Sequence, residues 1–178
     1  MMRAVLIAAS LAFAVAAVAS TDAGQPPASD PRAVLQEVIT LTDQRALPSW
    51  SDRDFPAKLR PYLTDGLLAA VAKGGKIAAA KGINLYDGEF FTGSQDVAHA
   101  KLISAEIAKL AGDTATVQAV VGTTDDPAAE VKTGDHVRYE MKRVAGVWKI
   151  DDFKNLEPYA KSQPSIKTLF SDPVRYGQ

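Results

Sequence analysis

The chain contains no cysteine, which excludes disulfides, thiolate catalysis, cysteine-bound zinc, iron–sulfur clusters and a lipidated cysteine. It also lacks an excess of either charge sign, because 20 basic and 21 acidic side chains leave a formal net charge of -1. Nucleic-acid-binding proteins usually carry a strong basic excess or a basic stripe, so this balance argues against a nucleic-acid partner. Without disulfides, the fold must be stabilised by its hydrophobic core.

Sequence motifs for cofactor chemistry are missing as well. Neither a Gly-x-Gly-x-x-Gly nor a Gly-x-Ser-x-Gly pattern occurs. The two histidines, His99 and His136, are expected on opposite faces of the predicted strands, where they could not readily share a metal. The acidic residues Asp125, Asp126 and Glu130 do not have the spacing of a calcium loop. The sequence therefore predicts no metal site and no cofactor.

The amino-terminal segment has the three parts of a secretory signal peptide. Arg3 gives a weakly positive start, and the apolar run 4–19 is shorter than the ~18–20 residues of a membrane-spanning helix. Ala17 and Ala19 are small residues at the two positions that a signal peptidase reads. This pattern predicts an exported protein, periplasmic or secreted, with no membrane attachment after cleavage.

The rest of the chain is expected to form one domain. We expect a signal peptide over 1–19, a flexible leader over 20–29, which is rich in small and turn-forming residues, and a single domain over 30–178.

Helical periodicity dominates the first half of this domain. Asp30-Pro31 resembles a helix start, and the apolar residues that follow recur at helical spacing as far as Leu41. A second helix is expected from a cap at Thr64 or Asp65 to Gly82. The adjacent glycines Gly74-Gly75 predict a kink or break inside it, because two glycines cost roughly 2 kcal/mol of helix propensity relative to alanine.

The second half alternates apolar and polar residues, as half-buried strands do. The strands are expected around 103–107, 117–121, 137–141 and 147–153, followed by a short helix after Pro164. Helices followed by antiparallel strands predict an α+β fold, in which N-terminal helices pack on the apolar face of a sheet of about four strands.

Three segments resemble a known family. They are 87–96 (DGEFFTGSQD), 148–153 (WKIDDF) and 165–169 (SIKTL). Together they are similar to the nuclear-transport-factor-two-like superfamily, which has a curved, cone-shaped sheet, and within it to a bacterial family of secreted or lipid-anchored proteins of unknown function. The chain departs from that family in having no proline near Phe90 and no cysteine for a lipid anchor. The resemblance implies a fold with a cavity under the sheet but implies no activity.

The alternation of side chains along the strands predicts which residues line that cavity. Side chains alternate between the faces of a strand, so Asp152 should share the core-facing side with Trp148, while Asp151 shares the outer side with Lys149. Tyr139 should face inward on the neighbouring strand. If the first strand begins early enough, His99 also faces inward, and a pocket of His99, Tyr139, Trp148 and Asp152 results.

Two functions stay open for such a pocket. The first is a non-catalytic module that binds a small ligand or a protein through Trp148, Tyr139 and Asp152. The second is a small cofactor-free enzyme, similar to isomerases and dehydratases of that superfamily, with Asp152 as general base and Tyr139 or His99 as proton donor. In the structural alternative, Asp152 simply accepts backbone N–H bonds at a strand end.

Two further features bear on partners. A patch around Trp50 and Phe90-Phe91 could anchor a protein, although packing in the core is the alternative. The outer sheet face carries Arg138, Glu140 and Lys142, whose charges argue against dimerisation through it, and both monomer and homodimer remain open.

Overall fold

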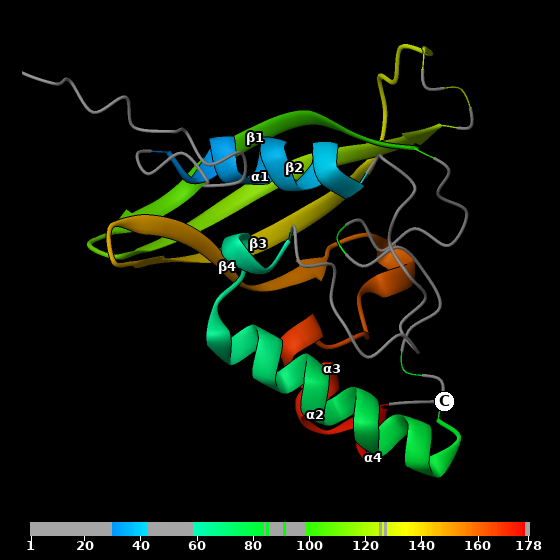
Figure 1. Cartoon of the computed structure of the whole chain (residues 1–178). Coiled ribbons are helices and arrows are strands. Elements are labelled where there is room, and N and C mark those ends of the chain that lie inside the picture. The colour runs from blue at the N-terminus through cyan, green and yellow to red at the C-terminus, as the bar shows by residue number, and fades with distance from the viewer. Residues whose placement is uncertain are drawn as a thin grey trace, which may run out of the picture.

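The computed structural model describes residues 30–42, 59–83, 85, 91, 99–124, 126 and 128–176. The predicted signal peptide and leader lie outside these ranges, as do Trp50 and Phe90. The described part of the chain has the predicted α+β architecture, with helices first, a four-stranded antiparallel sheet next and short helices last (Figure 1). Its elements are α1 (Pro31–Thr42), the 3-10 turn η1 (Arg60–Tyr62), α2 (Asp65–Lys81), β1 (His99–Ala111), β2 (Thr114–Thr124), β3 (Asp135–Val144), β4 (Val147–Asn155), η2 (Pro158–Ala160), α3 (Ile166–Ser171) and α4 (Pro173–Tyr176).

The four strands pair in chain order, β1-β2-β3-β4, so each neighbouring pair is antiparallel. Two tight turns join them at one end of the sheet. Gly112 has a φ of 56° in the first turn, and Ala145 and Gly146 have φ values of 50° and 83° in the second. Two consecutive residues with positive φ match the right-handed twist of the strands that they connect. The N–H of Arg143 donates to the carbonyl of Asp113 at 2.8 Å, which ties the two hairpin turns together.

Helix α1 covers the core face of the sheet (Figure 1). It begins as the sequence predicts, with the Asp30 carboxylate accepting a hydrogen bond from the N–H of Arg32 at 2.9 Å. One face of the helix is fully buried against the strands and consists of Val34, Leu35, Val38 and Ile39. Each such side chain stabilises the fold by about 1.5–3 kcal/mol on leaving water, so this stripe is what holds α1 to the sheet.

Helix α2 begins and ends at the predicted caps. The Thr64 hydroxyl accepts a hydrogen bond from the N–H of Leu67 at 3.2 Å, and Gly82 ends the helix with a φ of 63°. The predicted break at Gly74-Gly75 is wrong, because α2 runs through both glycines without interruption. The reason is tertiary packing. A methyl group on Gly74 would collide with the backbone carbonyl of Phe170 in α3, so this glycine lets two helices approach closely.

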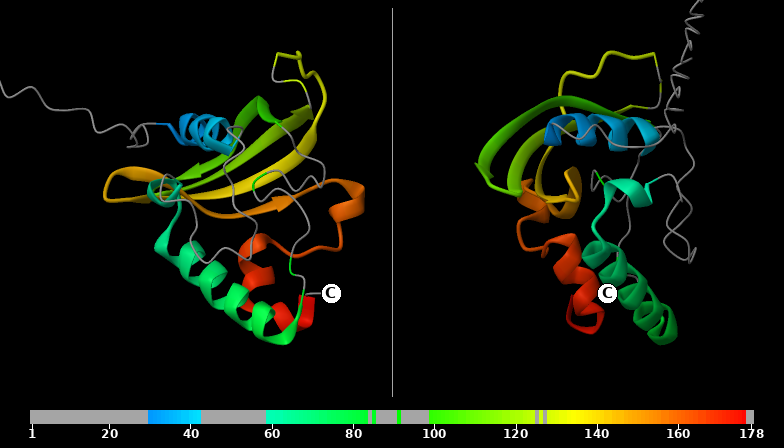
Figure 2. Two further views of the ribbon diagram at one scale, coloured as in Figure 1. Left: turned by 45° about the vertical axis from the view of Figure 1, so that its right-hand side comes forward. Right: turned by 60° about the vertical axis from the view of Figure 1, so that its left-hand side comes forward.

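The helices α2, α3 and α4 pack on one another beyond the β4 edge of the sheet, away from α1 (Figure 2). A single bridge connects the segment before α2 to that edge, with Leu63 beside Ile150 and the N–H of Thr64 donating to the carbonyl of Ile150 at 3.0 Å. Helix α2 therefore approaches the sheet at one strand, and its contacts there decide how the helical layer is attached. Among the residues that the structure describes, no helix is long and apolar enough to cross a membrane.

The two glycines of α2 should respond oppositely to alanine. We expect Gly75→Ala to stabilise the protein by about 0.5–1 kcal/mol, because nothing lies near its side-chain position and alanine favours the helix. Gly74→Ala should destabilise it by about 1–3 kcal/mol through the clash with Phe170. Urea unfolding of the two variants measures both changes, and equal effects of the same sign would contradict the close approach of α2 and α3.

Candidate functional site

A β-bulge in β4 decides the orientation of its side chains. Strand β3 pairs Met141 with Ile150 but Glu140 with Asp152, which leaves Asp151 as an extra residue on β4. A bulge of this kind interrupts the alternation of faces. Asp151 lies on the outer face with Lys142, as parity predicts, and it is nevertheless buried there.

The bulge also overturns the predicted orientation of Asp152. Because its cross-strand partner is Glu140, Asp152 lies on the face opposite the core, and Phe153 takes the next core position after Trp148. The Phe153 ring stacks on that of Tyr139 with centroids 5.8 Å apart. The prediction that Asp152 faces the cavity under the sheet is wrong.

The Asp151 carboxylate joins four elements of the fold. One oxygen accepts hydrogen bonds from the Thr64 hydroxyl at 2.7 Å and from the Lys167 ammonium at 2.8 Å. The other oxygen pairs with the Lys142 ammonium at 2.9 Å. The same Thr64 oxygen caps α2 by accepting from Leu67, so its hydroxyl proton is directed at Asp151. The sheet, α2 and α3 thus meet at one buried charge.

These contacts set the ionisation of Asp151. Burial is the largest single influence and alone would raise the pKa of the carboxyl. Hydrogen bonds from Lys167, Lys142 and Thr64, with the nearby charge of Lys167, together outweigh burial and lower the pKa below its ordinary value. Asp151 is therefore held as a carboxylate and is not poised to take up a proton near neutral pH.

Asp152 has a structural role in this arrangement. Its carboxylate accepts the N–H of Phe153 and the N–H of Lys167, each at 2.8 Å. The second bond satisfies a free donor in the first turn of α3. Ser165 occupies the cap position of that helix but donates its hydroxyl to Thr168, and within the described part of the chain it makes no side-chain capping bond. Asp152 caps α3 from the neighbouring strand instead.

The residues predicted to share a pocket are not brought together. Tyr139 is fully buried on the core face and donates its hydroxyl to the carbonyl of Phe91 at 2.7 Å. Asp152 lies on the other face. His99 opens β1 opposite Thr124, at the far end of the sheet from the turn beside Trp148.

The two histidines also differ from expectation. A register shift between Leu102 and Ser104 puts Ala100, not His99, on the core face. His136 pairs with Val120 on the non-core face, so the two histidines share a face, which corrects the predicted parity. His136 Nδ1 lies 2.7 Å from a Glu157 oxygen. The described residues contain no cluster of side chains suited to hold a metal ion.

Trp148 is buried, as the sequence predicts. The Arg143 guanidinium lies over its ring at 4.5 Å from the ring centroid, a cation–π distance. The indole N–H of Trp148 has no hydrogen-bond partner among the described residues. Arg143 therefore closes the core at the hairpin end of the sheet.

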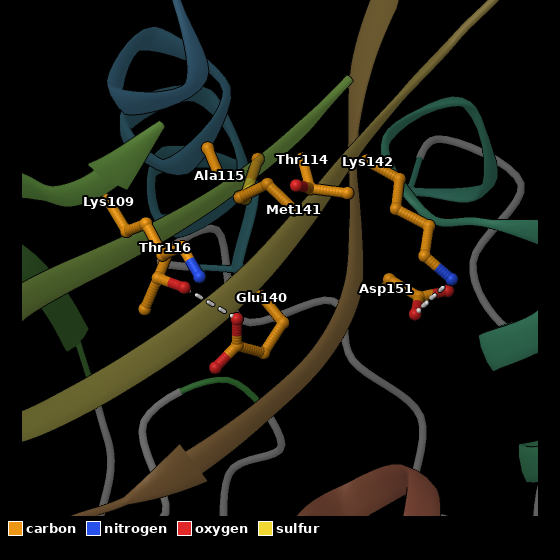
Figure 3. A pocket seen from close by; sticks show the side chains of 8 residues that line it. All are labelled: Lys109, Thr114, Ala115, Thr116, Glu140, Met141, Lys142 and Asp151. Carbon is orange, nitrogen blue, oxygen red and sulfur yellow. Dashed lines mark hydrogen bonds and ion pairs between the residues drawn. The ribbon is translucent and has the colours of Figure 1, made fainter. Parts of the chain in front are cut away.

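A pocket of about 200 Å³ opens on the non-core face beside the hairpin turns. Two cross-strand rows build it, one through Lys109, Thr116 and Glu140 and one through Thr114 and Lys142. Lys109 and Lys142 enter it from opposite sides, with Glu140 between them (Figure 3). The Thr116 hydroxyl donates to Glu140 at 2.8 Å. The remaining lining residues are Ala115, Met141 and Asp151.

Sequence reasoning missed this pocket. It treated Glu140 and Lys142 only as a charged outer face and did not single out Lys109. Strand alternation could have placed these residues on one face, but the pocket depends on the β1–β2 register, which has irregularities between Leu102 and Ser104 and between Ile107 and Lys109.

No protein-family model matches the chain, and no curated protein matches its sequence. Two solved structures are similar to it. One is the type VI native effector–immunity complex Tae3–Tai3 from Ralstonia pickettii, with 23% identity and a TM-score of 0.47 over 73% of this chain and 98% of that chain. The other is a phospholipid-binding protein from Ralstonia solanacearum in complex with a phospholipid, with 11% identity and a TM-score of 0.32 over 82% of this chain and 71% of that chain. Similarity at this level carries no argument about function.

Replacing Asp151 tests its role as the junction of the fold. We expect Asp151→Asn to destabilise the protein by about 2 kcal/mol at neutral pH, because two ammonium groups lose their counter-ion. The folded-state pKa of Asp151 lies below its unfolded-state value. Its contribution is therefore complete above about pH 4 and is lost as the pH falls through the folded-state pKa.

Urea unfolding of the wild type and the variant at about pH 7 and about pH 3 measures this effect. The stability difference should shrink at the lower pH. Asp113→Asn, at an exposed turn, is the matched control and should change little at either pH. A difference that is constant with pH would show that the charge of Asp151 is not what stabilises the junction.

Proposed function

We propose that the protein is a non-catalytic binding module that recognises a protein partner through the hairpin end of its sheet. The observation that carries this proposal is a small polar pocket at the end of the sheet where two aliphatic strand residues are exposed. Leu110 in β1 and Val144 in β3 are 58% and 45% exposed. By register, Val144 shares the face of the pocket, while Leu110, opposite buried Ala115, projects from the other face at the same end of the sheet. We call this surface, made of Leu110, Val144, Lys109, Lys142 and Arg143, the hairpin surface.

The size of the pocket favours a protein over a metabolite. Pockets for small molecules and cofactors usually measure about 300–1,000 Å³ and bury most of the ligand. A volume of about 200 Å³ suits one side chain better than a complete cofactor. A side chain that enters the pocket would bring the rest of its own protein against this end of the sheet, where Leu110 and Val144 are exposed.

Two residues of the hairpin surface, Lys142 and Arg143, are held in place before binding. The bond from Arg143 N–H to the Asp113 carbonyl links the two turns, and the Arg143 guanidinium is stacked on buried Trp148. Lys142 is fixed by Asp151. A surface that is ordered in advance loses less conformational entropy on association, which favours affinity.

The alternative of a proton-transfer enzyme receives no support from the described residues. Its proposed base, Asp152, already accepts two backbone N–H bonds, and its proposed donor, Tyr139, is committed to the Phe91 carbonyl on the other face of the sheet. In the pocket, Glu140 accepts from Thr116 and Asp151 accepts from three donors. These carboxylates act as fixed acceptors.

Export and family membership are part of the same proposal. We propose that residues 1–19 direct the chain out of the cytoplasm and that the domain is a nuclear-transport-factor-two-like fold. The order of elements, helices before a curved antiparallel sheet, supports the second statement. The apolar run and small residues of the first segment support the first statement.

Site-specific photo-crosslinking in the source cells tests the proposed function. A photoreactive phenylalanine analogue at position 110 or 144 should give a covalent adduct with the same protein, identified by mass spectrometry. Val174 in α4 is 57% exposed, which matches Leu110, and it lies away from the sheet, so the analogue at position 174 is the control. Adducts that are absent at 110 and 144, or identical at 174, would contradict the proposal.

A further inference from the structure

The charges around the pocket do not cancel. Four cations lie in or against it: Lys109 and Lys142 in its lining, Arg138 beside Glu140, and Lys167 beside Asp151. They face two carboxylates, Glu140 and Asp151. Each carboxylate has one cationic partner from outside the lining, with Arg138 Nε 3.0 Å from Glu140 and Lys167 Nζ 2.8 Å from Asp151.

The excess positive charge resides on the two lysines of the lining. Within the described ranges, Lys109 makes no hydrogen bond or ion pair. Lys142 directs one of its three ammonium N–H groups at Asp151, which leaves two that can donate to another group. A pocket with unused ammonium donors and occupied carboxylates attracts an anionic group.

We propose that the partner inserts a carboxylate side chain, from aspartate or glutamate, into the pocket between Lys109 and Lys142. This inference rests on the proposed function, because the exposed side chains of Leu110 and Val144 at the same end of the sheet favour a protein as the source of the carboxylate. A second copy of this chain is a poor occupant, since Lys109, Lys142 and Arg143 of one copy would face the same cations of the other.

The probe is N-acetyl-glutamate methylamide, which presents one carboxylate side chain, and its neutral isostere is N-acetyl-glutamine methylamide. Titrated into the isotope-labelled full chain, the glutamate compound should shift the amide resonances of Lys109, Thr114 and Lys142 saturably. The glutamine compound should not. Lys109→Ala should weaken the glutamate compound about fivefold, which is the scale of one partly exposed ion pair.

The control variant is Lys73→Ala, at an exposed lysine of α2 that should leave the affinity unchanged. Equal response to both compounds, no saturable response, or an unchanged affinity in Lys109→Ala would overturn the inference. Tighter binding of inorganic phosphate would assign the pocket to a free anion. Sedimentation with phosphatidylglycerol vesicles that depends on Lys109 would assign it to a membrane surface, and either result also overturns the inference.

The failure of this inference can be told apart from failure of the proposed function. If cross-links form at positions 110 and 144 but the glutamate compound causes no resonance shifts, the protein partner is supported and a carboxylate in the pocket is excluded. Missing cross-links would remove the protein partner itself, whatever the titration shows.

Discussion

The carboxylate of Asp151 is the interaction on which the rest of the structure depends. A buried charge is costly unless it is paired and hydrogen-bonded, and here one hydroxyl and two ammonium groups supply the partners. Those partners come from the start of α2, from β3 and from α3. Helix α2 contacts the sheet at the β4 edge, so the Asp151 carboxylate in β4 helps to fix the helical layer. The same carboxylate lines the pocket.

The bulge that makes Asp151 an extra residue of β4 also explains why two adjacent aspartates have different roles. The Asp151 carboxylate accepts hydrogen bonds from side chains, while the Asp152 carboxylate accepts one from a backbone N–H at the start of α3. Both functions concern stability and placement, so the acidic pair that suggests a catalytic base belongs to the framework. The binding that we propose uses the hairpin surface instead, where Lys109 and Lys142 line the pocket.

Alternation in the second half of the chain was enough to predict the four antiparallel strands and the burial of Tyr139 and Trp148. It failed at Asp151-Asp152, because both residues are polar and a period of two cannot reveal an inserted residue. Helix propensity failed at Gly74, where the decisive contact is with Phe170, far along the chain. The pocket could not be predicted either, because Lys109 and Glu140 meet only through the register of three strands.

The most direct test of this account is the pKa of the Asp151 carboxyl, followed by its side-chain carbon resonance in an NMR titration of the folded protein and of the urea-unfolded chain. The account predicts a lower pKa in the folded protein, because the hydrogen bonds from Lys167, Lys142 and Thr64 outweigh burial. A folded-state pKa equal to or above the unfolded-state value would mean that these partners do not hold the charge, and the junction between sheet, helices and pocket would then need another cause.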